Sequence, residues 1–467
     1  MKILVTGGTG FVGSKLVASL FKLGHELIVV TRCREKAKKK LPLPLVFLEG
    51  DLSKSPLSDV PQVDAVINLA GENIGEGRWT QREKKKIKDS RALLAENLIK
   101  SLSLENIKVF IQASAIGYYR ESDGDEWLDE TTGHGDHFLS KVCQAWELPA
   151  KSLTKSIRVV IPRIGVVLGS DGALMEKLIP LYRKGLGGVL GSGSQWMSWI
   201  HVDDLVNFFG QALEDESYSG AINLTAPKPV QNKQLNKVLA KYCQRPATFW
   251  IPKFILNLGM GEKSYLALSN QRLSSKLGKK IPFNFKYPEI DSAMREICGF
   301  EKLYGESSER FHYKIERLLY IPSTRNSAFE FFARPNNLEK ISSKSLNIKL
   351  VQISDNRLKE GTTFGFKVKK FGLGLTVKSK VIKLIEAECF IDDQVSGPFE
   401  TWSHRHEFVD AGTGCIALDK VKYRLPFKFL ADLVSIKAQS QVVEMFDQRV
   451  EDISNHFKDK NEINSLA

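Results

Sequence analysis

The 467-residue sequence has few cysteines and no long apolar run. Its six cysteines, at positions 33, 143, 243, 298, 389 and 415, lie far apart and form no Cys-x-x-Cys pair. This spacing offers neither a disulfide framework nor a cysteine metal site, and it fits a reducing compartment. No apolar stretch reaches the roughly 18–20 residues that a membrane-spanning helix needs. We therefore expect a protein without an integral membrane segment.

Targeting and nucleic-acid signals are also scarce. A predicted strand begins at Lys2, which leaves no room for a signal peptide, so we expect a cytoplasmic protein. The net charge is +13, but the lysines and arginines are scattered along the chain and are not gathered in one arm. A basic surface that attracts anionic ligands is therefore expected, and a nucleic-acid site is not. Because no nucleophile elbow occurs, His201 with Asp203 or Asp204 is interpreted as structural support and not as part of a hydrolytic triad.

The glycine-rich N-terminus carries the strongest positive signal. An aliphatic, β-branched run at residues 2–6 leads into Gly7, Gly10 and Gly13, and an apolar-periodic helix is predicted over 11–23. Strand, glycine turn and helix in this order are typical of a dinucleotide-binding crossover, in which the helix N-terminus holds the phosphates. The predicted phosphate-binding turn consists of Gly7, Gly10, Phe11, Val12 and Gly13.

Strands then alternate with helices, one of them a long helix predicted over 80–102. Further strands are predicted at 25–31, 45–48, 64–69, 109–113 and 157–161. This alternation predicts an α/β fold with a doubly wound parallel (Rossmann) sheet, whose ligand lies at the carboxyl ends of the strands. The residues predicted to contact a cofactor at those ends include Thr31, Asp51, Leu52, Ala70 and Gly71.

The end of the second strand predicts which cofactor is bound. An acid at this position would hold the 2′-hydroxyl of NAD, but the sequence continues with Arg32, Cys33 and Arg34. Two guanidinium groups can grip a 2′-phosphate, so we predict NADP(H) in preference to NAD(H). The alternative, that both arginines are plain surface residues, stays open.

Several motifs resemble one family. The glycine turn, Asn-Leu-Ala-Gly at 68–71, Gln-Ala-Ser-Ala-Ile-Gly-Tyr-Tyr at 112–119 and Trp-Ile-His-Val-Asp-Asp at 199–204 resemble the extended short-chain dehydrogenases/reductases. They are most similar to the atypical epimerase-like branch often labelled nucleoside-diphosphate-sugar epimerase. The resemblance spans residues 1–300 and implies an NAD(P)-binding epimerase-like domain.

The resemblance also implies a chemistry. The family uses a serine that bonds the reacting oxygen, and a Tyr-x-x-x-Lys helix whose tyrosine transfers the proton. Ser114 matches the serine, and Lys141 matches the lysine that holds the nicotinamide ribose. His137 occupies the tyrosine position. Three hypotheses follow: His137 transfers the proton, Tyr118 does so, or the site binds a dinucleotide without turnover.

Two further segments gain a role from the resemblance. Pro162 and Arg163 are implied to lie beside the nicotinamide. A Gly- and Ser-rich loop at 185–199 is implied to cover the substrate pocket, where Trp196 and Trp199 could stack on a sugar or base.

The pattern changes after a polar, non-periodic segment at 301–309, which we interpret as a linker. Residues 310–460 show successive strands closed by a long helix at 427–457, which predicts an α+β domain with an antiparallel sheet. The strands are predicted at 311–320, 348–354, 362–369, 373–384, 388–395, 402–410 and 415–424, with a helix at 323–332. This order, with Gly-Pro-Phe at 397–399, resembles helix-grip domains of the START/polyketide-cyclase type, which implies an apolar ligand.

Two histidines stand out in this second half. Period-two alternation places His404 and His406 on one strand face with Trp402 and Phe408. They could be polar groups that hydrogen-bond inside the pocket, or a His-x-His metal pair. Because no third ligand is evident nearby in the sequence, we expect hydrogen-bonded pocket histidines and no metal.

Together these patterns predict an NADP(H)-dependent oxidoreductase or epimerase for a small hydroxyl- or carbonyl-bearing substrate, fused to an apolar-ligand-binding domain. The alternative from another class is a non-catalytic, NADP(H)-responsive binding or regulatory protein. A third and weaker hypothesis is surface association through the positive charge. Whether the chain forms a homo-oligomer is left open by the sequence.

Overall fold

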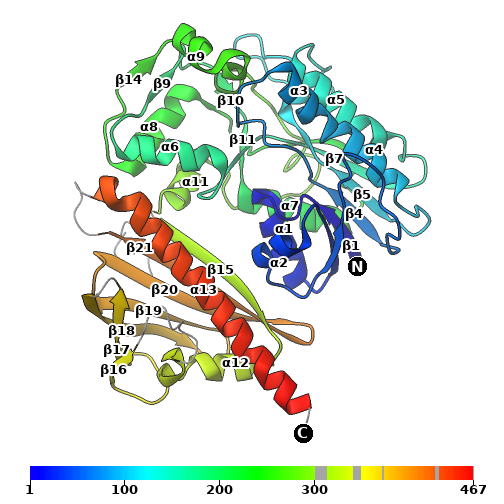
Figure 1. Cartoon of the computed structure of the whole chain (residues 1–467). Coiled ribbons are helices and arrows are strands. Elements are labelled where there is room, and N and C mark those ends of the chain that lie inside the picture. Colours follow the sequence, from blue (N-terminus) through cyan, green and yellow to red (C-terminus); the bar gives the residue numbers. More distant parts are fainter. Residues whose placement is uncertain (300–312, 340–348, 371–372, 426–430, 466–467) are drawn as a thin grey trace. The chain divides into compact units, whose positions relative to one another are not determined.

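The computed structural model describes residues 1–299, 313–339, 349–370, 373–425 and 431–465, which form two compact units (Figure 1). The first unit comprises Met1–Phe21, His25–Leu41 and Leu45–Cys298, and the second is built mainly from the described residues of Gly299–Ala467. The linker predicted at 301–309 lies outside the described residues.

A parallel sheet forms the centre of the first unit. Its strands lie in the order β12 (Gly220–Leu224), β7 (Arg158–Ile164), β5 (Val109–Gln112), β4 (Ala65–Asn68), β1 (Lys2–Thr6), β2 (Glu26–Thr31) and β3 (Val46–Glu49). All of these neighbours pair in parallel, and the short β6 (Ser114–Ala115) also pairs with β7. The strand order reverses between β1 and β4, which places a ligand crevice at their carboxyl ends. The predicted doubly wound sheet is confirmed.

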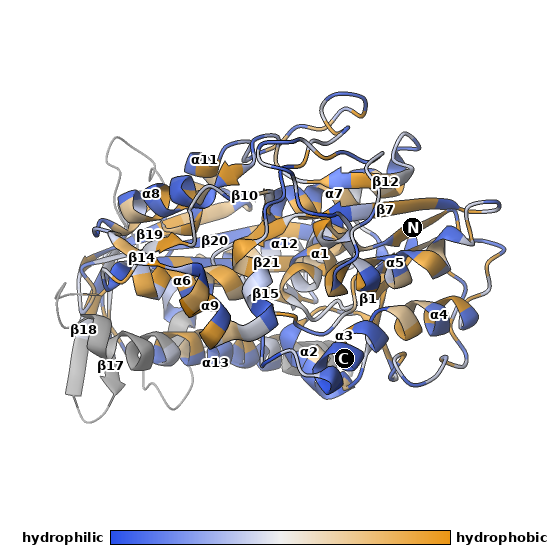
Figure 2. Ribbon diagram, turned by 90° about the horizontal axis from the view of Figure 1, so that it is seen from above, coloured by the Kyte–Doolittle hydropathy of each residue, from blue (hydrophilic) through white to orange (hydrophobic). Residues whose placement is uncertain are grey.

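Burial explains why the strands consist largely of apolar residues. β4 and β5 are buried at every residue, because a parallel sheet is covered on both faces. Figure 2 shows the contrast between the largely hydrophobic β7 and the hydrophilic α2 (Arg34–Lys40). The other helices that accompany these strands are α1 (Phe11–Lys22), α3 (Gln81–Asp89), α4 (Ala92–Lys100), α5 (Phe138–Lys151) and α7 (Val202–Glu214).

The prediction of one long helix over 80–102 is wrong, because two helices, α3 and α4, occupy this segment. The break falls at Ser90 and Arg91, whose side chains bond backbone groups. The Ser90 hydroxyl accepts from the N–H of Glu72 and donates to the carbonyl of Ile87. The Arg91 guanidinium donates to the carbonyls of Glu72 and Ile87. Such side-chain bonds compete with the helical ladder and turn the chain.

The remainder of the first unit consists of small sheets and short helices. Three strand pairs are formed by β8 (Val166–Leu168) with β11 (Trp199–His201), β9 (Gly188–Leu190) with β14 (Phe249–Ile251), and β10 (Trp196–Met197) with β13 (Val230–Gln231). The helices are α6 (Ala173–Arg183), α8 (Asn232–Cys243), α9 (Lys253–Met260), α10 (Tyr265–Leu268) and α11 (Ile290–Ile297), with 3-10 turns at Ile116–Tyr118 and Gly261–Ser264.

The second unit is a seven-stranded antiparallel sheet with a long helix lying along it (Figure 1). The strand order is β15 (Tyr313–Ile321), β21 (Gly414–Arg424), β20 (Thr401–Ala411), β19 (Cys389–Ser396), β18 (Leu373–Ile385), β17 (Thr363–Lys370) and β16 (Lys349–Ile353). The helices are α12 (Arg325–Phe332), the 3-10 turn Pro335–Glu339 and α13 (Ala431–Ser465). The predicted antiparallel α+β sheet is confirmed.

Two apolar clusters join α13 to this sheet. Val442 and Phe446 pack with Ile315 and Tyr423, whereas Ile453 packs in the cluster that contains residues of α12. Thr324 caps α12 by accepting a hydrogen bond from the N–H of Ser327. Among the described residues, no helix has both the length and the apolar character that crossing a membrane requires.

Candidate functional site

The glycine turn lies tightly between β1 and α1. Gly7 has a φ of +69°, which favours glycine, and a Cβ there would lie 2.8 Å from the carbonyl carbon of Leu69. A Cβ on Gly13 would lie 2.1 Å from the carbonyl oxygen of Gly7. No larger side chain fits at Gly13 without displacing the turn. The turn therefore places the N-terminus of α1 directly at the carboxyl end of β1, where N–H groups can face an anion.

A buried row of polar side chains crosses the neighbouring strand ends. The Thr6 hydroxyl donates to Asn68 Oδ1 over 2.5 Å, and Asn68 Nδ2 donates to Gln112 Oε1 over 2.9 Å. The N–H of Ala70 donates to the Thr6 hydroxyl oxygen over 3.3 Å. Sequence reasoning did not assign this row. It links β1, β4 and β5 and holds the 70–71 segment beside Gly7.

The two predicted 2′-phosphate ligands lie at the end of β2 with exposed side chains. The Arg32 guanidinium donates to Glu72 Oε1 over 2.9 Å, and 71% of its side-chain surface is exposed. Arg34 begins α2, and its backbone N–H donates to Glu49 Oε2. Thr31 bonds back to Cys33 through its hydroxyl. Glu72, which the sequence did not place near Arg32, is the group that a phosphate would have to displace.

The predicted adenine contact, Asp51, sits in a local turn. One carboxylate oxygen, Oδ1, accepts from the N–H and the hydroxyl of Ser53, and Oδ2 lies 3.4 Å from Lys54 Nζ. Partial burial opposes ionisation, but these hydrogen bonds outweigh it and lower the pKa of Asp51. Leu52 is buried and packs in the core, so only its backbone is available to a ligand.

Ser114 is tied to a buried ion pair. Its hydroxyl donates to Glu147 Oε1 over 2.7 Å. The Arg163 guanidinium donates through Nε and Nη2 to both oxygens of Glu147, over 2.9 and 3.1 Å, and Lys151 Nζ lies 2.8 Å from Oε2. Burial raises the pKa of Glu147, but the bonds to Arg163 outweigh it and the net shift is downward. Ionised Glu147 therefore accepts, and Ser114 must donate.

Arg163, implied to lie beside the nicotinamide, points its guanidinium into this interior cluster. Its side chain is 5% exposed. Pro162, the preceding residue, lies in β7 opposite Ile222 of β12. The guanidinium bonds Glu147 and the Tyr119 hydroxyl, so the role that the structure shows for Arg163 is to hold the Glu147 carboxylate.

Glu147 was missed at the sequence level, yet a signal exists. Cys143, Trp146 and Ala150 are buried on α5, and Glu147 lies on the same helical face. A lone acid on an apolar helical face is costly to bury unless it is paired. That pattern could have marked Glu147 as the partner of a buried cation.

The two adjacent tyrosines occupy different environments. Tyr119 is fully buried; its hydroxyl donates to Asn223 Oδ1 and accepts from Arg163 Nη1. Burial raises the pKa of Tyr119 to about 12, so this phenol stays protonated and structural. Tyr118 is only half-buried, and the Arg163 guanidinium carbon lies 3.5 Å from its ring centroid. Of the two phenols, Tyr118 is the accessible one.

His137 caps the N-terminus of α5. Its Nδ1 accepts from the N–H of Ser140 over 3.3 Å. Its Nε2 lies 3.0 Å from the Tyr119 carbonyl oxygen and 3.0 Å from the Tyr265 hydroxyl. Both ring nitrogens are thus engaged by the protein. Lys141, one turn further along α5, is exposed.

The loop at 185–199 differs from its expected role in one respect. Trp199 is fully buried and its Nε1 donates to the carbonyl of Lys228, so the prediction that Trp199 stacks on a ligand is wrong. Trp196 is half-buried; it donates to Asp125 and lies face-on to Arg272. A cavity of ≈610 Å³ adjoins this loop and is lined by Gly191, Ser192, Gln195, Trp250, Lys253 and Leu268.

His201 and its neighbours form structural bonds. His201 caps α7 by accepting from the N–H of Asp203, and its Nε2 lies 3.2 Å from Glu296 Oε2. Asp204 accepts from the backbone N–H groups of Lys286 and Tyr287. These contacts fit the expected supporting role.

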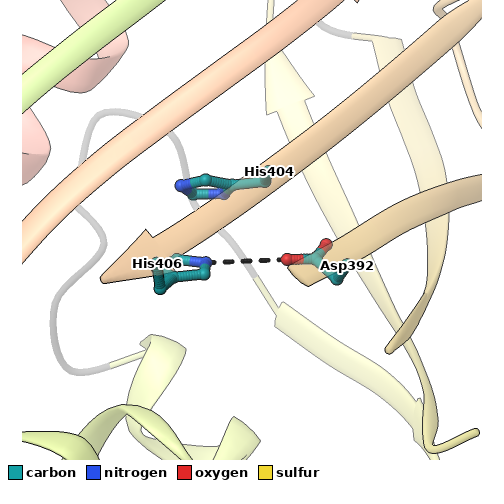
Figure 3. Close-up of side chains that lie close together, drawn as sticks. All are labelled: Asp392, His404 and His406. Atoms are coloured by element: carbon teal, nitrogen blue, oxygen red, sulfur yellow. Dashed lines mark ion pairs between the residues drawn. The ribbon is translucent and has the colours of Figure 1, made fainter. Parts of the chain in front are cut away.

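In the second unit, His404 and His406 are buried beside Asp392, with their ring centroids 3.8 Å apart and the ring planes tilted by 37° (Figure 3). Burial and the neighbouring His406 lower the pKa of His404. Burial also opposes protonation of His406, but the charge of Asp419 outweighs it and raises the pKa of His406. The aromatic face predicted for β20 is present, since Phe446 of α13 contacts both Trp402 and His404.

Comparisons with known proteins concern the first unit. A family model described as "NAD dependent epimerase/dehydratase family" matches residues 3–224, and one described as "Domain of unknown function (DUF1731)" matches 251–297. Epimerase family protein SDR39U1 homolog, chloroplastic, of Arabidopsis thaliana is 38% identical over 305 residues, which cover 64% of this chain and 86% of that protein. Epimerase family protein YfhF of Bacillus subtilis is 35% identical, over 65% of this chain and 99% of its own.

A solved structure of a protein from the same epimerase family is also similar to this chain. The crystal structure of human epimerase family protein SDR39U1 (isoform 2) with NADPH is 31% identical, with a TM-score of 0.58, and the match covers 64% of this chain and 99% of that one.

Proposed function

Because this chain belongs to the NAD dependent epimerase/dehydratase family, we propose that it is an NADP(H)-dependent oxidoreductase or epimerase. Its substrate would be a small molecule bearing a hydroxyl or carbonyl group. The observation that carries the proposal is the glycine turn 7–13, packed at the sheet's switch point with Arg32 and Arg34 at the end of the next strand. The human relative solved with NADPH supports the choice of cofactor.

In this proposal the first unit holds the cofactor along the carboxyl edge of the sheet. Gly7, Gly10, Phe11, Val12 and Gly13 receive the pyrophosphate at the N-terminus of α1. Thr31, Arg32 and Arg34 receive the 2′-phosphate, Asp51 and Leu52 border the adenine, and Ala70 and Gly71 run against the cofactor. When bound, the nicotinamide supplies hydride transfer.

Side chains of the first unit would bind the substrate hydroxyl and transfer its proton. Ser114 donates to Glu147, so its oxygen is oriented to accept a hydrogen bond from a substrate hydroxyl. Tyr118 is the accessible phenol and the preferred proton donor, whereas His137, with both nitrogens engaged, is better suited to hold the 118–119 turn. Lys141 would bond the nicotinamide ribose from α5. Pro162 would pack near the ring.

A second function is favoured by a specific observation. The tyrosine position of the Tyr-x-x-x-Lys pattern, four residues before Lys141, is occupied by His137, and the His137 ring caps α5. A non-catalytic, NADP(H)-responsive binding protein would keep the cofactor contacts without needing a proton donor there. Turnover separates the two functions, since both predict cofactor binding.

We also propose that residues 310–460 form a helix-grip domain of the START type that binds an apolar ligand. The support is its element order: a strand, α12, six further strands and α13 lying along the sheet. The aromatic side chains of Trp402, Phe408 and Phe446 gather between β20 and α13.

Titration with NADPH and NADH, followed by tryptophan fluorescence, tests the cofactor. We expect NADPH to bind at least about tenfold more tightly, since one charge-assisted bond is worth about 1.5–3 kcal/mol. Arg32→Gln and Arg34→Gln should weaken NADPH about 10- to 100-fold and leave NADH unchanged. Arg82→Gln, an exposed change on α3, is the control. Equal binding of both dinucleotides would contradict the proposal.

Mass spectrometry of small molecules retained through purification should name a substrate. Turnover with that compound then distinguishes an enzyme from a binding protein. If NADPH binds but no retained hydroxyl or carbonyl compound is oxidised, reduced or epimerised, the non-catalytic function is supported.

A further inference from the structure

Four polar side chains meet on one face of the second sheet. In the register of β19 with β20, Asp392 lies opposite His404, and in that of β20 with β21, His406 lies opposite Asp419. Residues two apart on a strand share a face, so the two histidines project to the same side. The register of β19, β20 and β21 therefore determines the positions of these four side chains.

Three of them are spaced as metal ligands. Each of Asp392, His404 and His406 offers one donor atom, and these three atoms lie within 4.8 Å of one another. All three residues are buried. His406 Nε2 is 3.5 Å from Asp392 Oδ2 (Figure 3). That distance exceeds the 2.7–3.2 Å of a good hydrogen bond. Two ligands on a tetrahedral zinc, with bonds of about 2.0–2.1 Å, lie about 3.3 Å apart.

A second carboxylate holds both imidazoles. One oxygen of Asp419 lies 3.3 Å from His404 Nε2 and 2.8 Å from His406 Nδ1. Because Asp419 engages His406 through Nδ1, the other nitrogen of that ring, Nε2, is the one that faces Asp392 and is placed to coordinate an ion.

The buried negative charge of the cluster also favours a bound cation. Two carboxylates, Asp392 and Asp419, are buried within this cluster. Arg449 of α13 lies 3.2 Å from Asp419 Oδ2 and compensates that residue. The charge of Asp392 is then left to a proton on a histidine or to a bound cation. Buried charges are stable only when compensated.

We propose that Asp392, His404 and His406 bind a divalent transition-metal ion, with Zn²⁺ as the preferred ion. Two imidazoles and one carboxylate suit Zn²⁺ and related ions and do not suit Ca²⁺ or Mg²⁺, which prefer oxygen ligands. Asp419 contacts the His406 nitrogen that faces away from Asp392, as carboxylates that orient metal-binding histidines do. Three protein ligands leave one coordination position for water or for a polar group of a bound molecule.

The third ligand was not evident from the sequence because it comes from another strand. Asp392 precedes His404 in the chain with a turn between β19 and β20. Only the antiparallel register brings the two residues opposite each other.

The test uses the full-length protein, treated with chelator and dialysed. Zn²⁺ is titrated by calorimetry, and Co²⁺ serves as a visible-absorption probe of tetrahedral coordination. We expect one ion per chain. The isosteric change Asp392→Asn and His406→Gln should each weaken Zn²⁺ binding more than about 100-fold, and Asp419→Asn about 10- to 100-fold. His134→Gln, an exposed histidine of the first unit, is the matched control and should bind as the parent does.

Thermal unfolding of each variant without metal checks that it is folded. If His406→Gln is unfolded, Asp392→Asn alone decides the outcome. Failure of the parent protein to take up stoichiometric Zn²⁺ or Co²⁺ overturns the proposal, as does unchanged binding in Asp392→Asn. The cofactor titration reports on the first unit and the metal titration on the second. A failure to bind NADPH can therefore be told apart from a failure to bind Zn²⁺.

Discussion

Ser114 and Arg163 share one oxygen atom of Glu147. The serine hydroxyl and the arginine Nε both donate to Oε1, over 2.7 and 2.9 Å, and the carboxylate is completely buried. The acid therefore sets the direction of the serine proton and anchors the cation on which the Tyr118 ring lies. A residue outside the expected catalytic set thus organises two members of that set.

Glu147→Gln should cost about 3–5 kcal/mol in the free energy of unfolding, because it leaves buried Arg163 without its counter-charge. Urea denaturation of the full chain measures this. The double change Glu147→Gln with Arg163→Met should recover part of the loss, since no uncompensated charge remains. Glu96→Gln, at an exposed position of α4, should change stability by less than about 0.5 kcal/mol. An equally small effect at Glu147 would contradict the role of this ion pair.

The same carboxylate should make stability depend on acid. The pKa of Glu147 lies below its ordinary value of 4.5 in the folded protein. Its contribution is therefore complete above pH 4.5 and is lost as the pH falls through the folded pKa. Urea unfolding of the parent and of Glu147→Gln from pH 7 downward should show their difference shrinking only below pH 4.5. A difference that is constant across this range would contradict the assignment.

Gly13→Ala should disrupt the turn, because its Cβ would lie 2.1 Å from the carbonyl oxygen of Gly7. We expect a loss of about 3 kcal/mol or more, together with loss of NADPH binding. Gly133→Ala is the matched control, since nothing lies within 4 Å of a Cβ there. Thermal unfolding and fluorescence titration report the two effects. Equal behaviour of the two variants would rule out close packing as the reason for the glycine.

Much of the first unit is predictable because its strands are short apolar runs separated by periodic helices. The parallel order and the glycine turn follow from this local pattern. The helix break at Ser90 does not, because it depends on bonds to the distant Glu72. Burial of Trp199 likewise depends on tertiary packing, since an indole suits both a core and a pocket.

Tyr118→Phe should reduce turnover about 100-fold or more if this phenol transfers the proton, and it should leave stability within about 0.5 kcal/mol. Tyr119→Phe should instead cost about 1–3 kcal/mol in stability, because Asn223 Oδ1 and Arg163 Nη1 lose a buried partner. Turnover with the retained substrate and urea unfolding separate the two effects. Full turnover of Tyr118→Phe would leave His137 as the remaining proton donor to examine.

For the site, sequence spacing predicts positions along the chain but not the bonds between them. Ser114 and Lys141 stand out because they match a motif, whereas Glu147 acts through burial and charge pairing. The same holds for Asp392, which approaches His404 only through strand register. Residues that act by meeting another element are the ones that a single sequence conceals.

The pairing of β15 with β21 has a consequence for biosynthesis. The first strand of the second sheet lies beside the last, with Tyr313 opposite Tyr423. During synthesis on the ribosome, β15 cannot pair with β21 until β16 to β21 have all emerged. The parallel sheet of the first unit, by contrast, has all its strands once Leu224 has been made. Folding during synthesis should therefore proceed in two stages, with the second delayed until translation has passed β21.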